Sequence, residues 1–238
     1  LKGRLSRELV QTLKELLKEI TTPLAIRSSS LMEDSQYQPL AGMYSTFMLP
    51  NCAKDPKERL SQVCEAIKRV FASTFFQEPK SIMDTIVQRH EEEKMAVILM
   101  EMVGQNYNGR YYPAFSGTAQ SFNFYTVSYM KRHEGVAHLA LGIRRTIANG
   151  EKSLRFSPKY TGILPQHYSI KATLESSQNT FYAMDLSPKA HPLSNGEEKN
   201  LSSYNLEIAE KDGSLKWSGS IISNEDNVIR DSLSYDGT

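Results

Sequence analysis

The stretch Leu24-Ala-Ile-Arg-Ser-Ser-Ser30, read together with Ala41-Gly-Met-Tyr-Ser-Thr46, decides the fold that we predict for this chain. Its apolar start predicts a short buried strand, and Arg27 stands at the exit of that strand, followed by three serines. A glycine turn at Gly42 follows fifteen residues later. Arginine, hydroxyl groups and free backbone N–H groups are the components of polyphosphate sites. These segments therefore predict a strand and a turn that together hold a polyphosphate.

Each component also has a plainer interpretation, which the sequence leaves open. Arg27 presents a rigid fork of donors that matches phosphate oxygens, but it also fits a structural salt bridge or a surface arginine. Gly42 lets the backbone approach a ligand closely, but it also fits an ordinary loop. Ser28 and the later turn favour the phosphate interpretation of Arg27. The Walker phosphate loop is excluded because its Gly-Lys-Ser/Thr ending is absent.

The N-terminal part of the chain predicts helices around this strand. Apolar residues at helical spacing form one stripe, made of Leu5, Leu9, Leu13, Leu16 and Ile20. Pro23 ends this helix, because the residue before a proline avoids helical dihedrals. A second helix starts at Asp55-Pro56, which supplies a capping carboxylate and a first-turn proline, and runs to about Phe76. A third helix is expected over residues 81–91.

The remaining chain predicts strands. Met95-Ala-Val-Ile-Leu-Met100 is a continuous apolar run, which predicts a central strand covered on both faces. Residues 110–141 are rich in Tyr, Phe, Thr and Val between turn residues, a composition typical of an antiparallel sheet. Further strands are expected over 177–186 and 204–220, with a tight hairpin turn at the Asp-Gly pair of Lys211-Asp-Gly-Ser214.

We therefore predict an α+β fold of two lobes. Residues 1–103 form a helix-rich α+β lobe, and residues 104–238 form a β-rich antiparallel lobe. Clefts between two such lobes are common places for ligands.

Composition narrows the class of protein. The formal net charge of +1 over 238 residues argues against a general nucleic-acid binder. No apolar run approaches the roughly 18 residues of a membrane span. Cys52 and Cys64 are isolated thiols that form neither a disulfide framework nor a metal site, so a reducing cytoplasm fits best. The histidines and acidic residues also lack metal-ligand spacing. A start at Leu1 rather than Met suggests a fragment of a longer protein.

Charge is unevenly distributed along the chain. Residues 131–159 contain seven Lys/Arg and two Glu, whereas residues 191–238 contain nine Asp/Glu and four Lys/Arg. These regions fit two solvated faces of opposite sign. Alternatively, the basic stretch faces an anionic ligand.

The opening motifs carry a family resemblance. Leu24-Ala-Ile-Arg-Ser-Ser-Ser-Leu-Met-Glu-Asp34 and Leu40-Ala-Gly-Met-Tyr-Ser-Thr-Phe47 resemble the N-terminal ATP-binding region of the phosphoenolpyruvate synthase and pyruvate phosphate dikinase family. That family reads A-V-R-S-S-A…E-D and then F-A-G-x-x-x-T-F. Lys94-Met-Ala-Val-Ile-Leu-Met-Glu-Met-Val103 is similar to its M-A-V-V-V-Q-x-M-V strand. Ser116-Gly117 and Ala140-Leu-Gly142 are similar to two shorter motifs.

The resemblance implies an ATP-grasp fold, with ATP clamped between two lobes, and a phosphotransferase activity. Arg27 would hold the ATP phosphates as the catalytic residue, with Ser28 beside it. The turn would cover the phosphates, through Gly42, Met43, Tyr44, Ser45 and Thr46. The hinge would meet the adenine edge with backbone groups of Glu101, Met102 and Val103. In the family, ATP phosphorylates a histidine on a mobile domain, which carries the phosphate to pyruvate.

The chain departs from the family pattern at several positions. Met100 replaces a glutamine, and Ile143 stands where the motif G-L-G-E places a glutamate. The phosphate-binding lysine is expected before residue 1, and the Mg²⁺-binding Q-D-I-E motif is not found by residue 238. The carrier-histidine motif and the pyruvate-binding domain are also absent. We therefore expect an incomplete, inactive fragment whose Mg²⁺ ligands lie outside this chain, with weak or no ATP binding alone.

Two other functions remain open from the sequence. One is a degenerate ATP-grasp module that binds a nucleotide or a partner without catalysis, which Met100 and Ile143 favour. The other is a structural α+β domain in which Arg27 pairs with an acidic residue. No nucleic-acid or membrane partner is expected.

Overall fold

The computed structural model describes residues 3–30, 33, 42, 44–76, 94–127, 129–187, 193, 200–217, 220–222 and 229–231. The chain divides into two compact units. The first is made of Leu1–Val103 with Met184–Leu201, and the second of Gly104–Ala183 with Ser202–Thr238. The helix predicted over 81–91 lies outside the described residues.

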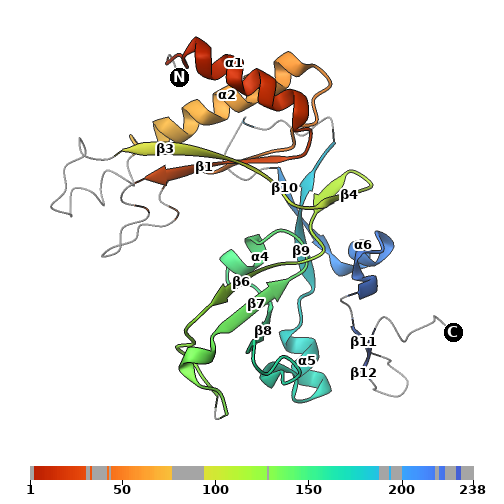
Figure 1. Ribbon diagram of the computed structural model, residues 1–238. Helices are drawn as coiled ribbons and strands as arrows, with labels where there is room; N and C mark the ends of the chain where they lie inside the picture. The colour runs from red at the N-terminus through yellow and green to blue at the C-terminus, as the bar shows by residue number, and fades with distance from the viewer. Residues whose placement is uncertain are drawn as a thin grey trace. The chain divides into compact units, whose positions relative to one another are not determined.

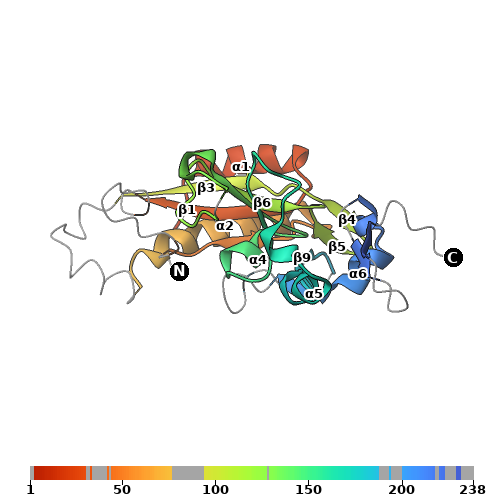
Figure 2. The same ribbon diagram turned by 90° about the horizontal axis from the view of Figure 1, so that it is seen from below.

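The first unit is a three-stranded antiparallel sheet with two helices on one face (Figure 1). The strand order is β2-β1-β3, where β1 is Leu24–Ser30, β2 is Phe47–Leu49 and β3 is Met95–Glu101. Strands β1 and β3 run side by side over their whole length, from Leu24 opposite Glu101 to Ser30 opposite Met95 (Figure 2). The helices are α1, Arg7–Glu19, and α2, Pro56–Ser73.

The core of this unit lies between the helices and one face of the sheet. Its buried members are Leu13, Leu17, Leu24, Ile26, Phe47, Leu49, Val63, Ala66, Ile67, Val70 and Leu193. The predicted start of α2 is confirmed, because Asp55 accepts a hydrogen bond from the Lys57 N–H at 2.9 Å and Pro56 opens the helix.

The predicted apolar stripe of α1 is wrong in part. Leu13 and Leu17 form the buried pair, one turn apart, whereas Leu9 and Leu16 are 38% and 36% exposed. Leu5 and Ile20 are partly buried and also pack against the core, so Leu9 and Leu16 are the members of the predicted stripe that do not.

The prediction that β3 is a central strand covered on both faces is also wrong. Among the described strands β3 lies at an edge of its sheet, and β1 is central. Met95, Val97 and Leu99 pack against the core, but Ile98 and Met100 are 43% and 45% exposed. Apolar residues therefore occupy both faces of β3, although the described helices cover only one of them.

The second unit is built from small antiparallel sheets. One has the order β10-β9-β5-β4, another β6-β7-β8, and a third pairs β11 with β12. The strands are β4, Gln105–Tyr107; β5, Arg110–Tyr112; β6, Ser116–Gln120; β7, Val136–Ala140; β8, Leu154–Phe156; β9, Thr180–Asp185; β10, Leu201–Asn205; β11, Ser220–Ile222; and β12, Ile229–Asp231. The short helices are η2, Arg132–Glu134; α4, Arg145–Ala148; η3, Pro165–His167; α5, Ile170–Ser176; α6, Leu206–Lys211; and η4, Ser214–Trp217.

The hairpin predicted over 204–220 is wrong, because Leu206–Lys211 forms helix α6. The Asp-Gly pair ends that helix, with Asp212 at its C-cap and Gly213 in the left-handed region at φ 73°. Glycine is favoured after a helix end for the same reason as in a tight hairpin turn, namely its tolerance of positive φ. The Asp212 carboxylate accepts hydrogen bonds from Arg110 Nε at 3.1 Å and Tyr112 Oη at 2.9 Å, which fixes α6 to β5.

Within the described ranges, none of the helices is long and apolar enough to span a membrane.

Candidate functional site

The candidate site lies on the face of the first unit's sheet that the helices leave uncovered. Side chains alternate between the two faces of a strand. Along β1, Ile26 and Ser28 point into the helix-covered face and are buried. Arg27 and Ser29 therefore share the opposite face, where Arg27 is exposed and Ser29 half-buried.

The strand register gives the neighbours of Arg27 on this open face. Arg27 lies opposite Ile98, and Ala25 lies between Met48 on β2 and Met100 on β3. One guanidinium thus stands among aliphatic and thioether side chains that are partly open to solvent. Such a surface offers a charge to an anion and apolar contact to a flat ring.

Arg27 makes no hydrogen bond or ion pair within the part of the chain that the structure describes. Other arginines are engaged: Arg59 donates to the Leu17 carbonyl at 2.7 Å, and Arg110 pairs with Asp212. A partner for Arg27 of the kind required by the salt-bridge interpretation is therefore not present among these residues.

The predicted turn divides into an exposed glycine and an anchored end. Gly42 is exposed with φ 80°, whereas Tyr44 and Ser45 are buried. The Ser45 N–H donates to Ser73 Oγ at 3.1 Å, which ties the segment to the end of α2. Thr46 is half-buried beside β2, and Met43 lies outside the described residues.

The predicted hinge is fixed to the segment before β1. Thr22 Oγ1 donates to Glu101 Oε1 at 2.6 Å, and the Met102 N–H donates to the Pro23 carbonyl at 2.9 Å. The side chain of Val103 is 83% exposed.

The match to a family model decides the identity of the region. Residues 1–210 match the family described as pyruvate phosphate dikinase, AMP/ATP-binding domain. The chain belongs to this family. Comparison with curated proteins gave no match. The predicted resemblance and the predicted α+β, ATP-grasp-like fold class are confirmed.

Membership of the dikinase ATP-binding family assigns ATP as the ligand class of the region and a phosphotransferase family as its context. The open face carries Arg27, which is unpaired among the described residues, together with the partly exposed apolar side chains of Ile98 and Met100. The described residues give no corresponding evidence for a magnesium site. The described residues contain no group of three or more His, Cys, Asp or Glu side chains that fits a metal ion.

Residue 143 shows how this dikinase-family chain departs from the motif G-L-G-E. Ile143 occupies the glutamate position, is only 8% exposed, and donates its N–H to the Tyr182 carbonyl at 2.9 Å. A buried aliphatic side chain cannot supply the carboxylate.

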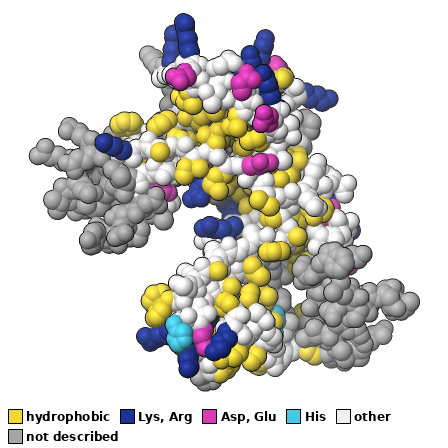
Figure 3. Space-filling view, in the orientation of Figure 1, with side chains coloured by type: hydrophobic (Ala, Val, Ile, Leu, Met, Phe, Trp, Pro, Cys, Tyr) yellow, Lys and Arg dark blue, Asp and Glu magenta, His cyan; other side chains and the backbone are white. Residues whose placement is uncertain are grey.

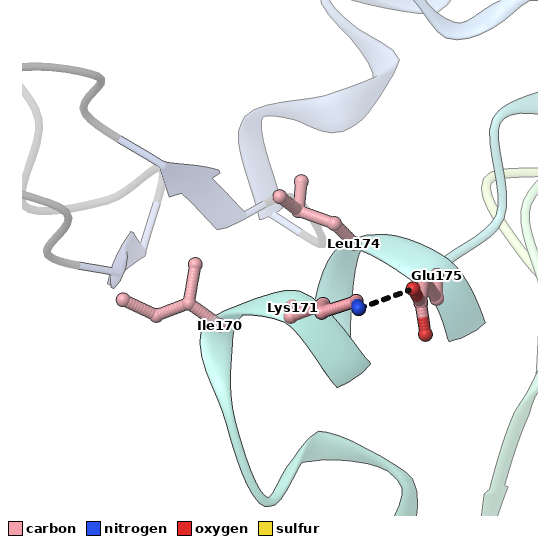
Figure 4. A pocket seen from close by; sticks show the side chains of 4 residues that line it. All are labelled: Ile170, Lys171, Leu174 and Glu175. Carbon is pink, nitrogen blue, oxygen red and sulfur yellow. Dashed lines mark ion pairs between the residues drawn. The ribbon is translucent and has the colours of Figure 1, made fainter.

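A depression lies beside α5 in the second unit of the dikinase-family chain. Figure 4 shows it lined by Ile170, Lys171, Leu174 and Glu175. An ion pair joins Lys171 Nζ to Glu175 Oε1 at 3.9 Å, and both side chains are largely exposed. Two aliphatic groups and a weak surface pair on one short helix provide no phosphate site.

Sequence reasoning missed three residues of the open face. Ser29, rather than the predicted Ser28, shares a face with Arg27, and Met48 and Ile98 complete the surroundings. The period-2 alternation of a strand was sufficient to choose Ser29. Met48 and Ile98 required the strand register, which the sequence does not contain.

Proposed function

We propose that this chain is part of the ATP site of a kinase that moves a phosphate from ATP to a carrier histidine and then to pyruvate. The histidine, the pyruvate-binding domain and the Mg²⁺ ligands lie outside this chain in the proposal. In this proposal, residues 1–103 and 104–238 correspond to parts of the two ATP-grasp lobes. The observation that carries the proposal is Arg27, unpaired among the described residues, on the open face of a family-matched domain.

In this proposal Arg27 binds phosphate oxygens through its planar fork of donors, with Ser29 as a hydroxyl donor on the same face. Gly42 to Thr46 covers the phosphates, with Gly42 as the exposed part and Ser45 as the anchor. The adenine edge is lined by the hinge residues Glu101, Met102 and Val103, next to the apolar side chain of Met100. The contribution of the protein is then positioning and charge neutralisation, which dominate phosphoryl transfer.

The test is formation of phosphohistidine from radiolabelled ATP in the longer protein that contains this chain. Arg27→Ala removes a charge-assisted contact worth about 1.5–3 kcal/mol, so the rate should fall roughly 10- to 150-fold. Arg7→Ala is the matched control, because Arg7 is also exposed, in α1. A rate for Arg27→Ala equal to that of Arg7→Ala would show that Arg27 does not hold the phosphates.

A second function, a nucleotide-binding module without catalysis, is favoured by the buried Ile143. The phosphohistidine assay combined with an ATP-binding titration separates the two. ATP binding that depends on Arg27, with no phosphohistidine formed, supports the non-catalytic module.

A further inference from the structure

The connection between β6 and β7 exposes several aromatic side chains. Phe124 is 69% and Tyr125 is 82% exposed, and the Phe122 ring lies edge-on to that of Phe124 with centroids 4.8 Å apart. Exposing large apolar groups costs free energy, and clusters of them on a surface mark interaction sites.

A buried polar residue holds this connection in place. Asn123 is 1% exposed, and its N–H donates to the Arg132 carbonyl at 2.8 Å. Its Oδ1 accepts from the Tyr125 N–H at 3.1 Å and from Arg155 Nη2 at 2.9 Å. Arg155 Nη2 also donates to the Tyr125 carbonyl at 2.7 Å. Asn123 and Arg155 therefore fix the backbone so that the flanking aromatic side chains face outward.

The same surface is positive. Lys131 and Arg132 are exposed, and the Asn123–Arg132 hydrogen bond places them beside the aromatic residues. The Glu134 side chain is only 4% exposed and is occupied, since it pairs with Lys159 Nζ at 2.7 Å and accepts from the Lys131 N–H at 2.8 Å. The sequence has no Asp or Glu between Glu101 and Glu134. Figure 3 shows Lys/Arg, His and apolar side chains, with an acidic side chain among them, at this end of the second unit.

We propose that this aromatic–basic surface, formed by Phe122, Phe124, Tyr125, Lys131 and Arg132, docks an acidic protein segment that carries apolar anchors. The inference goes beyond the proposed function, because it needs neither ATP nor phosphoryl transfer. Aromatic side chains and arginine are the residues that most often dominate protein interfaces. The two cations select an acidic partner by charge complementarity. A single-stranded nucleic acid fits less well, since it requires a series of cations along its phosphates and the chain has a net charge of only +1.

The probe is a short fluorescein-labelled peptide of Asp and Glu with two Phe anchors, titrated against the full chain by fluorescence anisotropy. Phe124→Ser with Tyr125→Ser should weaken binding at least about tenfold. Lys131→Glu with Arg132→Glu should weaken it similarly and remove most of its dependence on salt. Tyr168→Ser and Lys171→Glu are matched controls on the same unit, because these side chains are 84% and 85% exposed outside the surface.

A positioning variant separates a fixed surface from a collection of sticky side chains. Asn123→Ala keeps every proposed contact residue but removes the side-chain hydrogen bonds that fix the connection between β6 and β7. It should therefore also weaken binding of the peptide. If Asn123→Ala fails to fold, Arg155→Lys serves, since it loses the paired donors to Asn123 and Tyr125. Absence of binding, equal binding of the peptide with Lys in place of its acids, or tighter binding of oligothymidylate would overturn the proposal. An equal loss in the Tyr168 and Lys171 controls would do so as well.

Discussion

Replacing Arg59 should destabilise the first unit through the end of α1. Arg59 Nη2 donates to the Leu17 carbonyl at 2.7 Å and also to the Ile20 carbonyl, and its Nε donates to Asn51 Oδ1 at 2.9 Å. The last carbonyls of a helix have no partners within the helix. Arg59 supplies those partners, and Asn51 assists it with Nδ2 donated to the Ile20 carbonyl at 3.1 Å and the Thr22 carbonyl at 2.8 Å.

The size of the effect follows from these bonds. Arg59→Met keeps the apolar stem but removes the three hydrogen bonds that the charged guanidinium donates. Asn51, which is buried, then loses the donor to its Oδ1. Discounting for the partial exposure of Arg59, we expect a loss of about 2–4 kcal/mol in the free energy of unfolding. Asn51, which Arg59 bonds, also donates to the Thr22 carbonyl, and the Thr22 hydroxyl bonds Glu101 at the predicted hinge. The variant should therefore loosen the hinge as well as the helix end.

The assay is urea unfolding followed by circular dichroism, with Arg7→Ala as the control expected to change the free energy by less than about 0.5 kcal/mol. Asn51 has φ 54°, so Asn51→Gly removes the amide without adding backbone strain. The double variant should show a coupling of about 1–2 kcal/mol, because the two side chains bond each other. A loss below about 0.5 kcal/mol for Arg59→Met, or no coupling, would show that Arg59 and Asn51 do not stabilise the end of α1.

Two further predictions concern the second unit. Burial would raise the pKa of Asp212, but the hydrogen bonds from Arg110 and Tyr112 and the charge of Arg110 together outweigh burial and hold the pKa below its ordinary value. The contribution of Asp212 to the free energy of unfolding is therefore complete above the unfolded-state pKa near 4. It is lost as the pH falls through the lower native-state pKa. Asp212→Asn should lower the free energy of unfolding by about 2–3 kcal/mol at pH 7. Urea unfolding should show that this difference between the original protein and the variant disappears below about pH 4. Gly142→Ala combines φ 80° with a Cβ only 2.7 Å from the Tyr182 carbonyl oxygen, whereas Gly150→Ala has φ 69° in open space. Thermal unfolding should show a clearly larger loss of stability for Gly142→Ala than for Gly150→Ala. Equal losses in the two variants would contradict this prediction.

Helix starts and the strand carrying Arg27 were predictable because their signals are local. Asp55-Pro56 specifies its own cap, and the alternation along β1 requires no other element. The Asp-Gly pair at Asp212 misled because a helix end and a hairpin turn make the same demand for positive φ. Only the preceding residues, Leu206 to Lys211, decide between them.

The position of β3 was not predictable for a different reason. An apolar run on both faces indicates a buried strand when the protein covers both faces itself. Here Ile98 and Met100 remain partly exposed among the described residues, next to Arg27. In our proposal a bound ligand covers that face. The apolar residues on both faces of β3 would then reflect contact with this ligand and not with another part of the chain. The choice of Leu13 and Leu17 in α1 likewise depends on where α2 packs.

The most direct test of the account is the affinity for Mg-ATP, measured by isothermal titration calorimetry on the longer protein that contains this chain. We expect Arg27→Ala to weaken binding roughly 10- to 150-fold and Arg7→Ala to leave it unchanged. Equal ATP affinity in the Arg27→Ala and Arg7→Ala variants would contradict the claim that the open face of β1 and β3 holds the phosphates.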